Sequence, residues 1–375
     1  MSTVRLLKNG IEVFPAILRA VDQARASVAV EMFIFSDDGT GREVRDALVR
    51  AAARGVDVRV LVDAVGSWGL PESFWDVLTA SGGKVKVFRP VMRGLFLFRN
   101  HRKLVLIDDR RAFIGGLNVS DEYYRGRGGE APWRDNALEI DGYELVRLRR
   151  SFSRMWLRAD HPVRKTLLIM RRSYGLRPKP GQRIRFLESG PEDPLHSVRR
   201  GYRQIIGGAT TSIDLAMGYF YPHGRLIRAL KRAVRHGIRV RLLLPQHSDV
   251  AIARWAARGL YGRLLRAGIE VWEYRPSMLH AKMAIIDDTL ITGSANLDIR
   301  SGRINYELVA VVRDASLAGQ ARADFENDLK DSERIAYEQW RMRPMMQRLK
   351  ERVSYWILAR LDIFFARAEI LRMMR

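Results

Sequence analysis

The segments HRKLVLIDDRRAFIGGLN (residues 101–118) and HAKMAIIDDTLITGSANLD (residues 280–298) decide the fold of this chain. Both open with the pattern H-x-K-x-x-x-x-D, and in both a Gly-x-x-Asn sequence follows. A buried core would not demand these shared polar positions. Two copies in one chain therefore indicate a repeated functional unit.

A second pair of matching segments supports the repeat. SVAVEMFIF starts at Ser27 and SIDLAMGYF starts at Ser212, 185 residues later, while the two histidines His101 and His280 lie 179 residues apart. Each of these segments precedes an amphipathic helix pattern, a glycine and a second apolar run. The fold class predicted is α/β: two similar α/β/α half-domains, each a mixed sheet between helices, packed as an intramolecular pseudo-dimer.

The repeat sets the predicted boundaries of the domains. We expect a first half at residues 1–150 and a second half at 183–343, each carrying one motif. Between them, residues 151–182 form a predicted basic linker, since 147–185 holds thirteen Lys or Arg against one acid. The segment is interpreted either as a solvated helix face with a tether or as a contact for an anionic surface.

The spacing inside each motif places its polar side chains. The runs LVLI and MAII read as buried strands, so that the His and the Lys at i and i+2 point to one face. A second apolar run follows the Asp, and each motif therefore predicts a hairpin. Pseudo-twofold packing brings the two faces into one site, whose predicted catalytic residues are His101, Lys103, Asp108, His280, Lys282 and Asp287.

Two imidazoles and two ammonium groups suit phosphoryl chemistry. The lysines neutralise the growing charge of a pentacovalent transition state, so that neither a metal nor another cofactor is needed. One imidazole attacks phosphorus, and the other protonates the leaving alcohol and deprotonates the incoming one. The predicted phosphate-binding residues are Asn118, Ser294, Asn296 and Gly116.

A nucleophilic imidazole needs a carboxylate on its other nitrogen. Asp135, in WRDNALEI, and Glu307, in NYELVAVV, each follow one motif and precede an apolar run. Their paired placement favours this role over that of a surface charge at the start of a strand. Both are predicted to be catalytic.

The doubled motif resembles the signature of the phospholipase D superfamily. From residue 5 to 345 the chain is similar to bacterial cardiolipin synthases of that type, in the subgroup without membrane-spanning helices. The resemblance implies transfer of a phosphatidyl group through a phosphohistidine intermediate, with His101 as the nucleophile and His280 as the acid/base, an order that the residues alone leave open. It implies phospholipid substrates: phosphatidylglycerol, with phosphatidylethanolamine as another candidate.

Composition fits an enzyme at a membrane surface. The net charge of +23 predicts attraction to an anionic membrane face or to nucleic acid, and cysteine is absent. Neither a signal peptide nor a run of about 20 apolar residues is found, so we expect a peripheral protein on the cytoplasmic side. Hydrolysis by a phospholipase D and cleavage of nucleic acid remain alternative functions, and the oligomeric state stays open.

The C-terminal residues 344–375 predict an amphipathic helix. Apolar residues recur at steps of three or four, among them Met346, Leu349 and Val353, and basic residues flank them. This pattern is typical of an interfacial helix on an anionic membrane. The alternative interpretation is that the apolar stripe packs on the protein's own core.

Overall fold

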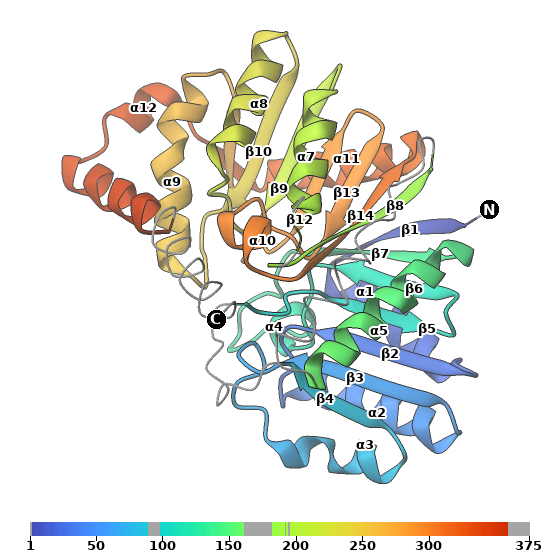
Figure 1. The fold of residues 1–375 in the computed structure, drawn as a ribbon. Coiled ribbons are helices and arrows are strands. Elements are labelled where there is room, and N and C mark those ends of the chain that lie inside the picture. Colours follow the sequence, from blue (N-terminus) through green and yellow to red (C-terminus); the bar gives the residue numbers. More distant parts are fainter. Residues whose placement is uncertain (1, 89–97, 161–181, 192, 194–195, 359–375) are drawn as a thin grey trace, which may run out of the picture.

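The computed structural model describes residues 2–88, 98–160, 182–191, 193 and 196–358. Two halves lie against each other, each with one mixed sheet and helices on both faces of it (Figure 1). The predicted fold class, two similar α/β/α half-domains, is confirmed. No helix in these ranges is long and apolar enough to cross a membrane.

The first half is built from alternating strands and helices that follow the predicted order. Its elements are β1 (Thr3–Lys8), α1 (Asn9–Asp22), β2 (Ser27–Met32), α2 (Gly39–Ala53), β3 (Asp57–Asp63), η1 (Glu72–Trp75), α3 (Asp76–Ala80), β4 (Lys84–Phe88), β5 (Leu104–Ile107), β6 (Arg111–Gly115), α4 (Asp121–Tyr124), β7 (Asn136–Asp141), η3 (Tyr143–Leu145) and α5 (Val146–Asp160).

The second half repeats this order and adds a short C-terminal part. Its elements are β8 (Ile184–Ser189), α7 (Ser197–Gly207), β9 (Ser212–Met217), α8 (Gly224–Arg235), β10 (Arg239–Pro245), α9 (Ala251–Leu265), β11 (Glu270–Tyr274), β12 (Lys282–Ile286), β13 (Thr289–Gly293), α10 (Ile299–Arg303), β14 (Glu307–Arg313), α11 (Ala315–Lys330), β15 (Ser332–Arg334) and α12 (Tyr337–Arg341). Residues 345–358 form a further helix.

The two sheets have the same topology. The strand order of the first is β1-β7-β6-β5-β2-β3-β4, and that of the second is β8-β14-β13-β12-β9-β10-β11, with β15 added at its edge. In both, three parallel strands join an antiparallel set. The motif segments form the expected hairpins, β5–β6 and β12–β13, whose turns hold Asp108 and Asp287 at positive φ. An internal duplication explains this match element by element.

The halves share one hydrophobic core. Buried side chains of both sheets meet there, including Leu104 and Leu106 of β5 with Met283 and Ile285 of β12. Helices α5 and α11 contribute to the same cluster, whereas α1 and α2 pack on the outer face of the first sheet. Continuous packing therefore fixes the ends of β5 and β12 that follow the two His-x-Lys sequences.

Helix α5 shifts one predicted boundary. It runs to Asp160, ten residues into the predicted linker, and it buries Phe152, Met155 and Trp156 in the shared core. Its apolar residues recur at helical spacing, which the large basic excess of the segment masked. Of the rest of that linker, residues 161–181 lie outside the described ranges.

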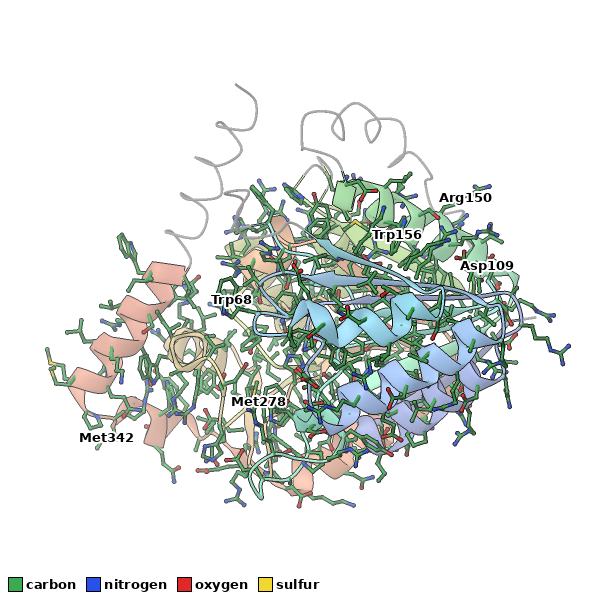
Figure 2. The ribbon with its side chains drawn as sticks, turned by 90° about the horizontal axis from the view of Figure 1, so that it is seen from below. Trp68, Asp109, Arg150, Trp156, Met278 and Met342 are labelled. Carbon is green, nitrogen blue, oxygen red and sulfur yellow. The ribbon has the colours of Figure 1, made fainter. Side chains whose placement is uncertain are left out.

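The helix at 345–358 lies beside α9 (Figures 1 and 2) and packs through a mixed side, on which Tyr355 and Leu358 contact the core of the second half. Glu351 is buried and bonds to Arg343 and Arg258, and Gly259 of α9 leaves no room for a Cβ beside the Glu351 carbonyl. The apolar stripe lies on the opposite side, where Met345, Met346 and Trp356 are 82%, 76% and 55% exposed. Packing of this stripe on the protein's own core, the alternative interpretation, is therefore wrong for the part of the helix that the structure describes.

Candidate active site

Main-chain hydrogen bonds between the two halves fix the positions of the two histidines. The segment before His101 forms a parallel bridge with Tyr306, and His101 N donates to the Tyr306 carbonyl at 3.0 Å. The residue before His280 forms a parallel bridge with Arg134, and the His280 N–H donates to the Arg134 carbonyl at 2.8 Å. Each histidine is therefore attached to the strand of the other half that leads into a carboxylate.

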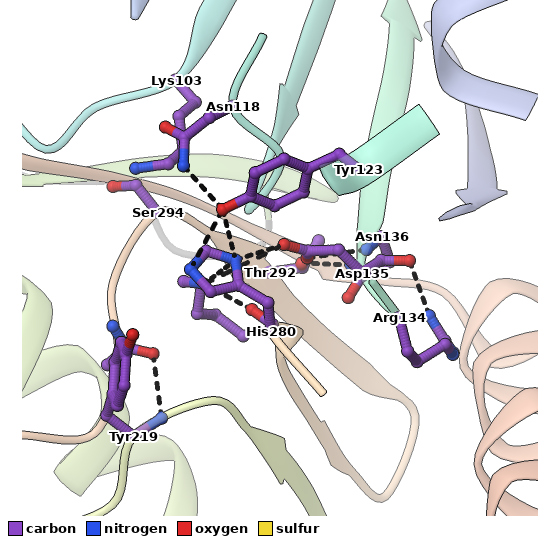
Figure 3. A network of polar contacts seen from close by, with 12 residues as sticks. Lys103, Asn118, Tyr123, Arg134, Asp135, Asn136, Tyr219, His280, Thr292 and Ser294 are labelled. Carbon is purple, nitrogen blue, oxygen red and sulfur yellow. Dashed lines mark hydrogen bonds and ion pairs between the residues drawn. The ribbon is translucent and has the colours of Figure 1, made fainter. Parts of the chain in front are cut away.

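The result is a crossed pairing of imidazoles and carboxylates. Nδ1 of His101 lies 3.1 Å from both oxygens of Glu307, which belongs to the second half. Nδ1 of His280 lies 2.7 Å from Oδ2 of Asp135, which belongs to the first half (Figure 3). The two predicted carboxylates are thus in contact with the histidines, although each serves the motif that it does not follow in sequence.

Both lysines lie in the same buried layer. Lys103 Nζ donates to the His101 carbonyl at 2.9 Å, and Lys282 Nζ bonds to the His280 carbonyl and lies 3.9 Å from Oδ2 of Asp135. Burial and the neighbouring ammonium lower the pKa of Lys103 to about 7, and burial lowers the pKa of Lys282 to about 8. Two such cations, poorly hydrated and side by side, favour the arrival of an anion.

Burial also keeps the imidazoles neutral. It lowers the pKa of His101 to about 4 and the pKa of His280 well below its ordinary value, and Lys103 and Lys282 act in the same direction. A neutral ring with Nδ1 fixed by a carboxylate presents Nε2 as a nucleophile or a base. A bound phosphodiester would favour the protonated form of either ring, because its negative charge offsets the positive charge of the lysines.

One cavity joins the two histidines. It has a volume of about 610 Å³, and residues of both halves line it, including His101, Asn118, His280 and Asn296. This volume is within the usual range of sites for small organic ligands. The prediction that the two motifs build a single site is consistent with this cavity.

The side-chain N–H groups of Asn118 and Asn296 differ in their hydrogen bonds. The side-chain oxygen of each holds an equivalent main-chain N–H, that of Ile34 for Asn118 and that of Tyr219 for Asn296. The amide of Asn118 donates to the Tyr123 hydroxyl at 2.7 Å. Within the described residues no such acceptor meets the amide of Asn296, which is free to bind a phosphate oxygen.

Ser294 and Gly116 support carboxylates, which corrects their predicted contact with phosphate. The Ser294 hydroxyl donates to Glu307 and accepts from Leu308 N at 2.9 Å. A Cβ at Gly116 would lie 2.3 Å from the Asp135 carboxylate, so any larger residue would displace that group. The first motif therefore has Gly116 beside Asp135, where a side chain would not fit, and the second has Ser294 beside Glu307, to which it donates a hydrogen bond.

The aspartates of the two motifs also lie elsewhere than predicted. Asp108 accepts from the main-chain N–H groups of residues 25–27, and Asp287 accepts from those of residues 210–212. Each follows its strand at the end away from the lysine, about 15 Å along the chain from it at strand rise. Their role is therefore to fix the turn before β2 or β9, and the prediction that they are catalytic is wrong.

Sequence reasoning missed several residues around the histidines. The Tyr123 hydroxyl lies 3.4 Å from both ring nitrogens of His280, and Trp133 packs against the same ring. On the second half, Tyr219 donates to Asp249 at 2.6 Å inside the cavity. Tyr123 follows the first motif by only a few residues, but nothing in its spacing distinguishes it from a core aromatic.

Curated relatives cover almost all of this chain. It is 35% identical to cardiolipin synthase 1 of Bacillus cereus over 365 residues, which are 93% of this chain and 71% of the relative. It is 34% identical to the major cardiolipin synthase ClsA of Bacillus subtilis, with 94% and 74% covered. The cardiolipin synthase A of Pseudomonas entomophila is 37% identical, with 94% and 73% covered.

Solved structures share the fold. The phosphatidylserine synthase of Haemophilus influenzae superposes with a TM-score of 0.74 at 14% identity, over 97% of this chain and 94% of that one. The polyphosphate kinase of Porphyromonas gingivalis has a TM-score of 0.59, also at 14% identity, over 88% and 51%. The family described as "Cardiolipin synthase, PLD-like domain" matches residues 17–156 and 202–329. The chain belongs to this phospholipase D-like family of cardiolipin synthases.

Proposed function

We propose that this protein is a phosphatidyltransferase that makes cardiolipin or a related phospholipid. The observation that carries the proposal is the crossed pair of neutral imidazoles, which line one cavity and are each oriented by a carboxylate of the other half. Lys103 and Lys282 are buried beside these histidines. The names of the relatives, cardiolipin synthases that cover most of this chain, support the same reaction. Phosphatidylglycerol is the proposed donor, and an alcohol on a second phospholipid is the acceptor.

The first step forms a covalent intermediate. Nε2 of His101 attacks the phosphorus of the donor, and the bond from phosphorus to the headgroup oxygen breaks. The leaving oxygen takes a proton from His280, whose imidazolium Asp135 stabilises. Lys103 and Lys282 offset the charge that grows on the phosphoryl oxygens, which is their largest contribution to the rate.

The second step reverses the roles around phosphorus. His280 takes the proton of the acceptor hydroxyl, the acceptor oxygen bonds to phosphorus, and the bond to Nε2 of His101 breaks. Glu307 keeps the Nδ1 proton of His101 in place throughout. The different surroundings of the rings support this assignment, because Nε2 of His101 has no protein partner among the described residues, whereas His280 contacts Lys282 and Tyr123.

Binding to the cytoplasmic face of the membrane is part of the proposal. The exposed apolar side of helix 345–358 carries Met345, Met346, Leu349, Val353 and Trp356, and basic residues flank it. The same helix continues to Leu358, which lines the cavity of the histidines. An exposed apolar side with basic neighbours suits a helix that lies in an anionic interface, and Leu358 on the packed side brings the same helix to the edge of the cavity.

Incubation with mixed vesicles tests the reaction. Purified protein should convert phosphatidylglycerol, alone or with phosphatidylethanolamine, into cardiolipin and the released headgroup, read by mass spectrometry. Phosphatidic acid as the sole product would mean hydrolysis instead of transfer. Cleavage of a plasmid without any change in lipid would overturn the proposal in favour of a nuclease.

A further inference from the structure

A second cavity adjoins the active site on the second half. It has a volume of about 360 Å³ and lies among the starts of α7, α8 and α10. Asn296 and Asp298 line both this cavity and that of the histidines, so the two spaces share a wall. Nothing in the proposed mechanism uses it.

Cationic side chains dominate this cavity. Arg199, Arg200, Arg203 and Arg225 line it, against one acid, Asp298. Burial raises the pKa of Asp298 to about 7, which reduces its repulsion of an anion. Three of the arginines, Arg200, Arg203 and Arg225, have exposed side chains and lack an acidic partner in the part of the chain that the structure describes. Arginines gathered without carboxylates are an arrangement that phosphate satisfies.

The equivalent place in the first half is closed by the protein's own acid. There the Asp121 carboxylate accepts from Gly39 N at 3.2 Å and from Thr40 N at 2.8 Å, at the start of α2. Asp38, the N-cap of α2, accepts in turn from Asp121 N. The first helix thus begins against a carboxylate, which its N–H groups require.

The second half has no carboxylate at the equivalent position. The start of α8 is equivalent to that of α2, but His223 replaces Asp38, Arg225 replaces Thr40 and Ile299 replaces Asp121. The Arg225 N–H donates to Nδ1 of His223 at 3.3 Å. An anion in place of the missing carboxylate would satisfy this helix start and the arginines together.

Helix α7 differs from its counterpart α1 in the same direction. Phe14 of α1 packs on Tyr124 at 5.1 Å between ring centroids, and only about 30 Å³ of space remains beside it. Arg199 stands at the position of Phe14, and the larger cavity is open there. The buried Tyr202, which also lines the cavity, has a hydroxyl without a hydrogen-bond partner among the described residues. Arg199 in place of Phe14 thus adds a cation to the cavity of the second half.

We infer that this cavity binds the phosphodiester of the acceptor phospholipid, while the donor phosphorus reacts between the histidines. The inference rests on the proposed function and names the acceptor class, an alcohol that carries its own phosphate. One glycerol joins the two phosphates of cardiolipin, so the two phosphate sites must be neighbours. The shared wall at Asn296 and Asp298 meets this requirement.

The kinetic test compares two acceptors. In the double variant Arg203→Gln/Arg225→Gln, the ratio of kcat/KM for short-chain phosphatidylglycerol to that for glycerol should fall at least about tenfold, through the KM of the lipid. Arg232→Gln/Arg235→Gln, at the far end of α8, removes the same number of charges from exposed side chains and should leave the ratio as it is. An unchanged ratio in the double variant would overturn the assignment to an acceptor lipid.

A binding test needs no turnover. Inorganic phosphate, titrated by calorimetry, should occupy two sites in the wild-type protein and one in the double variant. A single site in both would overturn the cavity as an anion site. Two sites that become one, with the acceptor ratio unchanged, would identify a site for free phosphate and not for lipid. Two phosphate sites in a protein that transfers to no alcohol would sink the proposed function but leave the anion site standing.

Discussion

The two histidines occupy equivalent places in a duplicated fold but have unequal surroundings. His101 lies against the Phe33 ring and keeps 12% of its side chain exposed, whereas His280 is 5% exposed and is enclosed by Tyr123, Trp133 and Lys282. Symmetry provides the crossed carboxylates, and the differences support the proposed roles of His101 as nucleophile and His280 as proton carrier. The two halves therefore share a scaffold but give the two rings different environments.

The largest effects should come from the histidines themselves. His101→Ala and His280→Ala should each lower turnover at least about a thousandfold, since each removes an indispensable group. With a soluble nitrophenyl phosphodiester, which needs no acid to leave, His280→Ala should still release one equivalent of nitrophenol in a burst, and His101→Ala should release none. A burst from His101→Ala instead would exchange the two roles.

The crossed carboxylates should follow with losses of about a hundredfold or more. Glu307→Gln should slow the burst, because Glu307 orients the nucleophile, whereas Asp135→Asn should slow the later steps more than the burst. Rapid-quench measurement of the burst separates the two. If Asp135→Asn alone slowed the burst, the carboxylate would be acting on the other histidine.

The alkaline limb of the pH profile should depend on the lysines. The pKa of Lys103 is lowered to about 7 and that of Lys282 to about 8, so charge needed for phosphate is lost as pH rises through these values. We expect kcat/KM for a soluble phosphodiester to fall by up to about tenfold per pH unit above this range. Between pH 5 and 6 both lysines are charged while His101 stays neutral, and a profile still rising above pH 9 would contradict this account.

Tyr123 should have a smaller effect that is confined to one histidine. Tyr123→Phe removes the hydroxyl near His280 and should lower kcat about tenfold, with a smaller change in the burst. Tyr124→Phe is a matched control, since Tyr124 packs on Phe14 outside the cavity. Equal effects of the two variants would mean a role in packing and not in catalysis.

The smallest effect concerns helix 345–358, because the interface is shared by many side chains. Met345→Gln with Trp356→Gln should weaken binding to anionic vesicles several-fold, while turnover of a soluble phosphodiester persists. Ile11→Gln, an equally exposed apolar position on α1, is the control. Sedimentation with vesicles measures the binding, and added salt should weaken it further. Full binding by the double variant would move the membrane contact elsewhere.

The sequence predicted the duplication and the His-Lys pairs because both leave periodic marks in the chain. It also predicted that Asp135 and Glu307, each at the start of a strand, would contact a histidine. It did not predict the crossing, since Asp135 lies closer in sequence to His101 than to His280, and only tertiary packing decides the partner. The prediction failed for Asp108 and Asp287, because their fixed spacing after the His-Lys pair indicates a shared function but not which one. Their carboxylates accept main-chain hydrogen bonds that stabilise a turn.

The crossed carboxylates also have a consequence for biosynthesis. A chain that emerges from the ribosome in order presents His101 long before Glu307, and without that carboxylate the nucleophile has no fixed tautomer. The first half holds His101 and Asp135 but neither of their partners, Glu307 and His280, so each pairing waits for the second half. We therefore expect a product truncated before residue 307 to lack catalytic activity on lipids, because its His101 has no carboxylate partner.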